Sequence, residues 1–261
     1  MPKADTSVSL SGLRIWLTRP EGRAADLISA IEAAGGDACH EPVMRIAPYS
    51  DVFRPEAFEQ AQQRLAEIQQ YDRLIFISVN AVKALADLLP GQVLPPCWAI
   101  GNATEMALKR QGWPVAPSER AMNSEALLSL PEWRQVESQR IAIIKGAGGR
   151  GLLAQTLVER GAEVTGIPLY ERQPISLPES RLRQLLTEFN VNCVCVNSAE
   201  TLAFLQQQWN PACVDAPPTL VVPSQRVASA VNEEWFSPVV VSANAGLDAT
   251  LEALRAIRQT I

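Results

Sequence analysis

The chain contains two copies of one strand-and-helix pattern, and this internal repeat constrains the fold more than any other feature of the sequence. The first copy starts at Leu13 with LRIWLTRPEGRAADLISAIEAAGGDACHEPVMRI, and the second starts at Gln139 with QRIAIIKGAGGRGLLAQTLVERGAEVTGIPLYER. The alignment that pairs Leu13 with Gln139 also pairs Gly35 with Gly161. Each copy predicts a strand, a glycine-bearing turn, an amphipathic helix that ends at a glycine, and an extended segment.

A weaker repeat follows each copy. LIFISVNAVKALADLL (74–89) resembles VCVNSAETLAFLQQQ (194–208) and pairs Ser78 with Ser198, while WAIGNATEMALKRQGWPV (98–115) resembles LVVPSQRVASAVNEEWFSPV (220–239). Strands that alternate with helices predict parallel sheets covered by helices on both faces. The sequence therefore predicts an α/β fold of two similar parallel-sheet domains, flavodoxin-like or Rossmann-like, produced by an internal duplication.

The extended segment of each copy contains proline, in ACHEPVMRIAP and in AEVTGIPLYERQP. Proline cannot donate a hydrogen bond to a neighbouring strand, which argues against a central position in a sheet. We therefore expect edge strands or extended connectors. Such a pair could join two domains and leave a cleft between them.

The composition excludes several classes of site and partner. His40 is the only histidine, and the five cysteines form no C-x-x-C pair. The sequence therefore shows no recognisable zinc-ligand spacing. Any Ser-His-Asp or Cys-His catalytic relay would have to use His40. Cys193 and Cys195 alternate within an apolar run, which favours buried, reduced thiols. A net charge of −5 argues against nucleic acid or an anionic membrane as partner.

The first residues, MPKADTSVSLSG, lack a basic region followed by an apolar stretch, so they do not predict an export signal. The chain also lacks the run of about eighteen apolar residues that predicts a membrane-spanning helix. We expect a cytoplasmic protein, with a monomer as the working expectation.

The loop after the second copy's first strand has the spacing G-x-G-x-x-G on Gly146, Gly148 and Gly151, and Glu171 follows about twenty residues later. This pattern is found in NAD-binding loops. The equivalent loop of the first copy, TRPEGRA, keeps only Gly22, and Glu171 follows the proline-bearing segment. We therefore favour a tight turn whose glycines permit positive φ and leave helix N–H groups open. An NAD-linked oxidoreductase is kept as the alternative.

Several strand-to-helix turns carry small polar or basic residues. Ser, Thr and Asn at helix starts are first of all caps, but exposed N–H groups and helix dipoles also favour carboxylate or phosphate groups. Because parallel strands end at one edge of a sheet, we expect these turns to form a receptor for an anionic ligand. The turns are Arg19–Arg23, Ser78–Asn80, Asn102–Thr104, Gly146–Arg150, Asn197–Ser198 and Ser224–Arg226.

In order along the chain, the stretches IWLTRPEGRA, FISVNAVKAL, AIGNATEMAL, KGAGGRGLLAQTLVERGAEV with PLYERQP, VNSAETL and VVPSQRVASAV resemble the uroporphyrinogen-III synthase family of tetrapyrrole biosynthesis. Together they cover nearly the whole chain. The family often has a Thr-Ser-Pro-like turn where this chain has FISVN, so Ile77 replaces a possible hydroxyl and Ser78 keeps one.

The resemblance implies two domains joined by a pair of antiparallel connecting strands, with the substrate between the domains. One domain would comprise residues 1–40 and 174–261 and the other residues 48–165, with connecting strands at 41–47 and 166–173. The implied reaction closes hydroxymethylbilane, a linear tetrapyrrole polycarboxylate, to uroporphyrinogen III with loss of water and inversion of the last pyrrole ring. It implies a hydro-lyase that needs no cofactor and no metal.

The resemblance also implies site residues. Tyr170 matches the family's tyrosine in LYER, and a phenol that is protonated at neutral pH could donate a proton to the departing hydroxyl; the alternative is a tyrosine that anchors the connector. Thr104 matches the threonine of a G-x-x-T turn and would contact a substrate carboxylate or act as a helix cap. The other candidate substrate contacts are Arg19, Ser78, Gly148, Ser198 and Ser224. A non-enzymatic two-domain protein that binds an anionic ligand is a further alternative.

Overall fold

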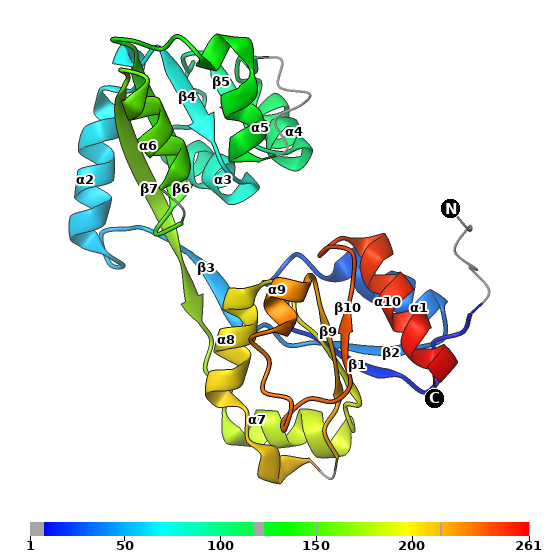
Figure 1. The fold of residues 1–261 in the computed structure, drawn as a ribbon. Coiled ribbons are helices and arrows are strands. Elements are labelled where there is room, and N and C mark those ends of the chain that lie inside the picture. The colour runs from blue at the N-terminus through cyan, green and yellow to red at the C-terminus, as the bar shows by residue number, and fades with distance from the viewer. Residues whose placement is uncertain (1–7, 117–122, 150, 215, 261) are drawn as a thin grey trace. The chain divides into compact units, whose positions relative to one another are not determined.

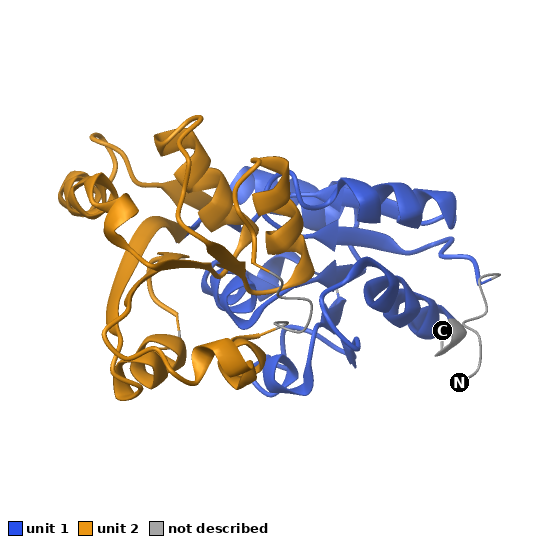
Figure 2. Ribbon diagram, turned by 90° about the horizontal axis from the view of Figure 1, so that it is seen from above, with its two compact units in different colours: residues 1–45, 173–261 blue, residues 46–172 orange. Residues whose placement is uncertain are grey.

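The computed structural model describes residues 8–116, 123–149, 151–214 and 216–260. The chain forms two units, one of residues 1–45 and 173–261 and the other of residues 46–172 (Figure 2). We call them unit 1 and unit 2. The chain passes from one unit to the other within the two segments that the sequence analysis proposes as connectors.

Unit 1 is built from strands that alternate with helices (Figure 1). Its elements are β1 (Arg14–Leu17), α1 (Ala25–Ala33), β2 (Asp37–His40), α7 (Glu179–Arg183) followed by a short π-helix (Gln184–Glu188), β8 (Cys193–Cys195), α8 (Ala199–Gln208), a 3₁₀ turn (Pro211–Cys213), β9 (Thr219–Val222), α9 (Gln225–Ala228), β10 (Val239–Val241) and α10 (Leu247–Thr260).

Unit 2 has the same alternation of strands and helices (Figure 1). Its elements are α2 (Pro55–Ala66), a 3₁₀ turn (Ile68–Gln70), β4 (Arg73–Phe76), α3 (Val79–Leu88), β5 (Cys97–Ala99), α4 (Asn102–Arg110), α5 (Ser124–Ser129), a 3₁₀ turn (Pro131–Trp133), β6 (Arg140–Gly146) and α6 (Leu152–Glu159). The strands β3 (Met44–Pro48) and β7 (Glu163–Pro174) complete its sheet.

Four strands of each sheet have the same order, as the internal repeat predicts. Sheet A of unit 1 has the order β10-β9-β8-β1-β2, and sheet B of unit 2 has the order β3-β7-β6-β4-β5. The strands β9-β8-β1-β2 of unit 1 correspond to β5-β4-β6-β7 of unit 2. The fifth strand differs, because β10 lies beside β9 in unit 1 and β3 lies beside β7 in unit 2. β1 pairs with β2 in parallel from Arg14↔Asp37, and β6 pairs with β7 in parallel from Arg140↔Glu163. Both pairings start at equivalent positions of the two sequence copies. The predicted fold of two similar parallel-sheet units is confirmed.

Both faces of each sheet are buried, which explains why the strands read as continuous apolar runs. In β1, Trp16 packs into one apolar cluster with Val194, whereas its neighbours Ile15 and Leu17 pack into another cluster with Cys195. Successive side chains point to opposite faces of a strand, so one short strand serves two cores. Burying each large apolar side chain contributes about 1.5–3 kcal/mol to the free energy of unfolding.

The proline-bearing segments differ in part from the expectation. β2 and β3 are edge strands, as expected, but β7 lies between β3 and β6 and is an interior strand. Pro168 pairs with Lys145, and the register then shifts so that Gly146 pairs with Tyr170. A register shift interrupts the regular ladder, and a residue without an N–H is tolerated at such a point.

The cysteines agree with the expectation of reduced thiols. Cys193 and Cys195 are free and buried in β8. Burial raises the pKa of the Cys97 thiol in β5 to about 12, so this thiol stays protonated and unreactive at neutral pH. Across the described ranges, no helix is both long enough and apolar enough to cross a membrane.

Candidate active site

Four of the site residues predicted from the sequence lie where the parallel strands of sheet B end. Ser78 follows β4, Thr104 lies in the first turn of the helix after β5, and Gly148 follows β6. Tyr170 lies in β7, where it pairs with Gly146 at the end of β6. We call these four residues together with Gly146 the sheet-B edge. Ligands of open α/β sheets usually bind at the carboxyl ends of the strands.

Tyr170 is a buried member of the sheet-B edge. Its side chain is only 2% exposed and packs in the apolar cluster that includes Phe76, Ala81 and Ile144. The phenol oxygen lies 2.8 Å from the hydroxyl oxygen of Ser78. Strand pairing and ring packing fix the phenol at the start of α3, on the edge where a ligand is expected.

Gly146 gives the Tyr170 ring the space that it occupies. A Cβ atom at residue 146 would lie 2.6 Å from Cε2 and 2.7 Å from Cζ of Tyr170, closer than such atoms can approach. The glycine is therefore needed because of a close approach between β6 and a side chain of β7. This is a different reason from the positive φ that the sequence pattern suggests for this loop.

The rest of the glycine loop is a turn between β6 and α6. Gly148 has a φ of +71° and the next residue, Gly149, has a φ of +93°, values that favour glycine. Gly151 precedes α6 with a φ of −76°, so the expectation of positive φ is wrong for this glycine as well as for Gly146. Arg150 of the same turn lies outside the described residues.

Glu171 has a structural partner. Its two carboxylate oxygens accept hydrogen bonds from the Arg54 guanidinium at 3.0 and 3.1 Å. This bidentate ion pair holds the turn before α2 against β7. The same carboxylate and burial together raise the pKa of the nearby Tyr49 phenol, burial being the larger cause. A nucleotide ribose would have to compete with Arg54 for Glu171, which weighs against the NAD alternative.

Ser78 and Thr104 occupy different positions in their helices. Ser78 caps α3, since its hydroxyl oxygen accepts a hydrogen bond from the Ala81 N–H at 3.1 Å. Thr104 is 4% exposed and lies inside the first turn of α4, where Gly101 is the capping residue. The alternative of Thr104 as the helix cap is therefore wrong. β6 and β4 separate the strand of Tyr170 from the strand that leads to Thr104.

The other three predicted residues lie at the carboxyl ends of strands in sheet A. Arg19 follows β1, and its guanidinium donates hydrogen bonds to the Ala245 carbonyl at 2.7 Å and the Thr250 hydroxyl at 3.3 Å. Burial lowers the pKa of Arg19. Ser198 caps α8 by accepting from the Thr201 N–H, and the Ser224 carbonyl accepts the first hydrogen bonds of α9. All three therefore have structural partners.

The protein-family model described as "Uroporphyrinogen-III synthase HemD" matches residues 25–252, which is most of the chain. The chain belongs to the uroporphyrinogen-III synthase family. The uroporphyrinogen-III synthase of Escherichia coli (strain K12) is 31% identical over 258 residues, covering 93% of this chain and 100% of that protein. The Salmonella typhimurium enzyme is 30% identical with the same coverage.

Two solved structures from the uroporphyrinogen-III synthase family support the fold. The enzyme of Helicobacter pylori 26695 aligns with a TM-score of 0.63 at 16% identity, covering 94% of this chain and 99% of that one. A mutant enzyme of Thermus thermophilus aligns with a TM-score of 0.57 at 20% identity, covering 96% of this chain and 100% of that one. At these identities the likeness shows the fold alone.

The single histidine of this family member has a structural hydrogen bond. His40 lies at the end of β2, and its Nε2 atom is 2.8 Å from the carbonyl oxygen of Arg19. Within the described part of the chain, no three histidine, cysteine or acidic residues gather so that they could hold a metal ion.

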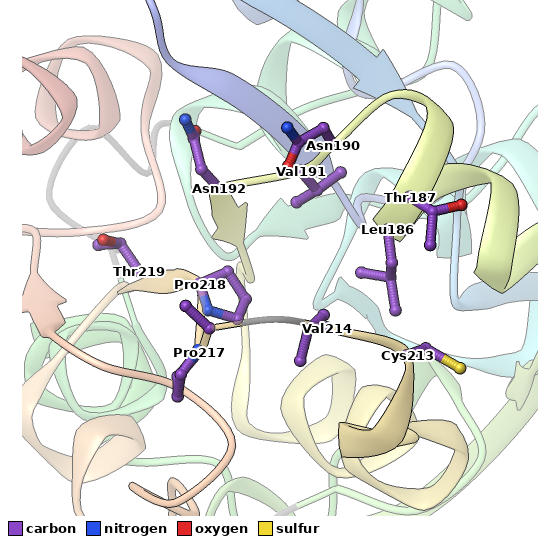
Figure 3. Close-up of a pocket in the computed structure, with 11 residues that line it drawn as sticks. Leu186, Thr187, Asn190, Val191, Asn192, Cys213, Val214, Pro217, Pro218 and Thr219 are labelled. Atoms are coloured by element: carbon purple, nitrogen blue, oxygen red, sulfur yellow. The ribbon is translucent and has the colours of Figure 1, made fainter.

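A cavity of about 310 Å³ lies in unit 1, away from the carboxyl ends of the sheet A strands (Figure 3). Val191 and Asn192 precede β8 and Pro218 precedes β9, so the cavity is at the amino ends of these strands. Figure 3 shows the two prolines 217 and 218 on one side and Leu186 with Thr187 of the π-helix on the other. The residues of unit 1 that were predicted for the site lie at the opposite, carboxyl ends of the sheet A strands.

Sequence reasoning missed three contacts of the candidate site. It proposed Ser78 and Tyr170 for separate roles, but their hydroxyl groups form one hydrogen-bonded pair. It also missed the requirement for glycine at residue 146 and the role of Arg54. None of these contacts has a signal in local spacing, because each joins residues far apart in the sequence.

Proposed function

We propose that this protein is a uroporphyrinogen-III synthase, a cyclising hydro-lyase that converts hydroxymethylbilane to uroporphyrinogen III. The observation that carries the proposal is the hydrogen-bonded pair of Tyr170 and Ser78 at the sheet-B edge, in a chain that belongs to this family. We further propose that it acts in the cytoplasm as a monomer and without a cofactor.

In the proposed reaction the substrate itself supplies the electrons that expel the leaving group, so the protein needs no nucleophilic side chain. A pyrrole nitrogen of the substrate expels the terminal hydroxyl as water and leaves a delocalised azafulvenium cation. A substituted carbon of the last ring then attacks to give a spiro intermediate, which fragments and closes again with that ring turned. The free substrate can close without this inversion, so the main task of the protein is to hold the reacting carbons in one geometry.

In this proposal Tyr170 supplies the proton that turns the departing hydroxyl into water. Its ring is held by packing and by strand pairing with Gly146, so the phenol keeps one position during the reaction. Such fixed geometry is what makes general-acid assistance effective. Enclosure from water also strengthens the interaction between the phenol and the developing charge.

The substrate's acetate and propionate groups need donors. We propose Ser78 (through its backbone N–H), Thr104 and Gly148 of unit 2 as contributors to their binding. Arg19, Ser198 and Ser224 are the corresponding proposals for unit 1. Backbone N–H groups at the starts of helices are suited to carboxylates, since several donors converge there with a favourable helix dipole.

An isomer assay tests the proposed function directly. Freshly generated hydroxymethylbilane is added to the protein, and the uroporphyrinogen isomers are separated after oxidation to porphyrins. We expect isomer III to predominate, because the bound substrate is held for inversion, whereas the protein-free control gives the isomer without inversion. An isomer mixture equal to that of the control would reject the synthase and favour a protein that only binds an anionic ligand.

A further inference from the structure

The two members of the hydroxyl pair differ in their access to solvent. The Tyr170 side chain is 2% exposed, whereas Ser78 is only partly buried at the start of α3. Their oxygen atoms are 2.8 Å apart. Of the two hydroxyl groups, Ser78 therefore carries the one that a substrate can reach more easily.

The hydrogen bonds of Ser78 indicate a direction for the pair. A serine hydroxyl accepts two hydrogen bonds and donates one. One acceptor position of Ser78 is used by the Ala81 N–H at 3.1 Å. If the Tyr170 phenol donates a hydrogen bond to the second acceptor position of the Ser78 oxygen, the Ser78 hydroxyl can donate its own hydrogen to an acceptor outside the pair. The opposite direction would require an outside acceptor to reach the hydrogen of the enclosed phenol.

The equivalent serine of unit 1 provides an internal comparison. Ser198 caps α8 by accepting from the Thr201 N–H at 3.1 Å, as Ser78 does from Ala81. Its second partner is the Thr201 hydroxyl at 2.8 Å, which in turn donates to the Asn197 side chain. Unit 2 has Ala81 at the position of Thr201, so the hydroxyl of Ser78 bonds instead with Tyr170.

We propose that Ser78 is a catalytic residue that relays the proton from Tyr170 to the leaving hydroxyl of the substrate. The inference rests on the proposed function. As the substrate C–O bond breaks, the leaving oxygen takes the Ser78 hydrogen and departs as water, and the phenol hydrogen moves to the Ser78 oxygen. The substrate loses one hydrogen, as a proton, from the unsubstituted carbon of the last ring, which forms the final ring-closing bond. That proton returns through Ser78 to the phenolate and restores both groups.

A double-mutant cycle tests the relay. In single-turnover experiments, Ser78→Ala is expected to slow the formation of isomer III by about as much as Tyr170→Phe, within a range of roughly 10²–10⁴-fold. The double variant should be no slower than the slower single variant, to within a factor of about two, because both groups act on one proton path. Losses that multiply in the double variant would contradict the relay.

Two further variants separate the relay from the capping role of Ser78. Asn123→Ala removes a matched cap, since Asn123 caps α5 by accepting from the Ala126 N–H at 2.7 Å, and it should leave the single-turnover rate unchanged. Ser78→Thr keeps a hydroxyl and a cap and should restore most of the rate. A Ser78→Ala protein that folds and keeps the wild-type rate would overturn the proposal.

The dependence of the single-turnover rate on the fraction of D₂O distinguishes the relay from a purely structural role of the two residues. Two hydrogens that move in one step predict a curved dependence for the wild-type protein, and Tyr170→Phe should reduce the curvature. A linear dependence in the wild-type protein would overturn the relay. Failure of the proposed function is distinct, because a wild-type protein that forms no isomer III would reject the synthase itself.

Discussion

The Tyr170→Phe protein is expected to form uroporphyrinogen III about 10²–10⁴-fold more slowly than the wild-type protein, because the general acid of the proposed reaction is lost. The ring itself is retained, so the packing against Phe76 and Ile144 should persist. Loss of the hydrogen bond to Ser78 should lower the free energy of unfolding by only about 1 kcal/mol. The measurement is the single-turnover rate of isomer III formation beside a urea unfolding curve.

Tyr71→Phe is the matched control for Tyr170→Phe. Tyr71 is also buried, but it precedes β4 and so lies at the amino end of sheet B, away from the sheet-B edge. The same removal of a phenol oxygen there should leave the rate of isomer III formation unchanged. If Tyr170→Phe and Tyr71→Phe had the same rate as the wild-type protein, Tyr170 would be a packing residue and the acid would have to be sought elsewhere.

Gly146→Ala is expected to impair both stability and activity. The new methyl group would lie 2.6 Å from Cε2 and 3.0 Å from the oxygen of Tyr170, and the enclosed ring must move to admit it. Forcing a methyl group into a packed site typically costs about 1–3 kcal/mol. Displacement of the phenol would also break its hydrogen bond with Ser78, so the rate of isomer III formation should fall toward that of Tyr170→Phe.

Gly166→Ala gives the corresponding control in the same sheet. A Cβ atom at Gly166 would meet only the Lys145 side chain, at 3.9 Å, which is an ordinary contact. This variant should retain both the wild-type rate and nearly all of the stability. A Gly146→Ala protein with wild-type stability and rate would show that the Tyr170 ring is not held as the structure has it.

The alternation of strands and helices and its repetition along the chain were sufficient to predict the two parallel sheets, because these patterns can be recognised in the sequence itself. The repeat that aligns Leu13 with Gln139 predicts two similar sheets, and both sheets have equivalent registers at Arg14 and Arg140. Proline was a weaker guide, since Pro168 lies in an interior strand beside a register shift. A single sequence does not reveal where a ladder is interrupted.

The candidate site could be predicted only in part. The strand-to-helix turns follow from alternation along the chain, so Ser78 and Tyr170 could each be singled out. Their mutual hydrogen bond joins residues 92 positions apart, and the Arg19 guanidinium is held by a carbonyl 226 positions away. Such contacts depend on how the sheets are assembled, and periodicity does not encode them.

The most direct test of the central claim, that the Tyr170 phenol lies where the tetrapyrrole binds, uses the small number of tyrosines. The chain has three, so ¹³Cζ-tyrosine labelling gives three resonances, and the Tyr170→Phe spectrum assigns the one of interest. Anaerobic titration with uroporphyrinogen III should shift the Tyr170 resonance and leave that of Tyr71 in place. An unchanged Tyr170 resonance at a product concentration that saturates inhibition of the enzyme would contradict the claim.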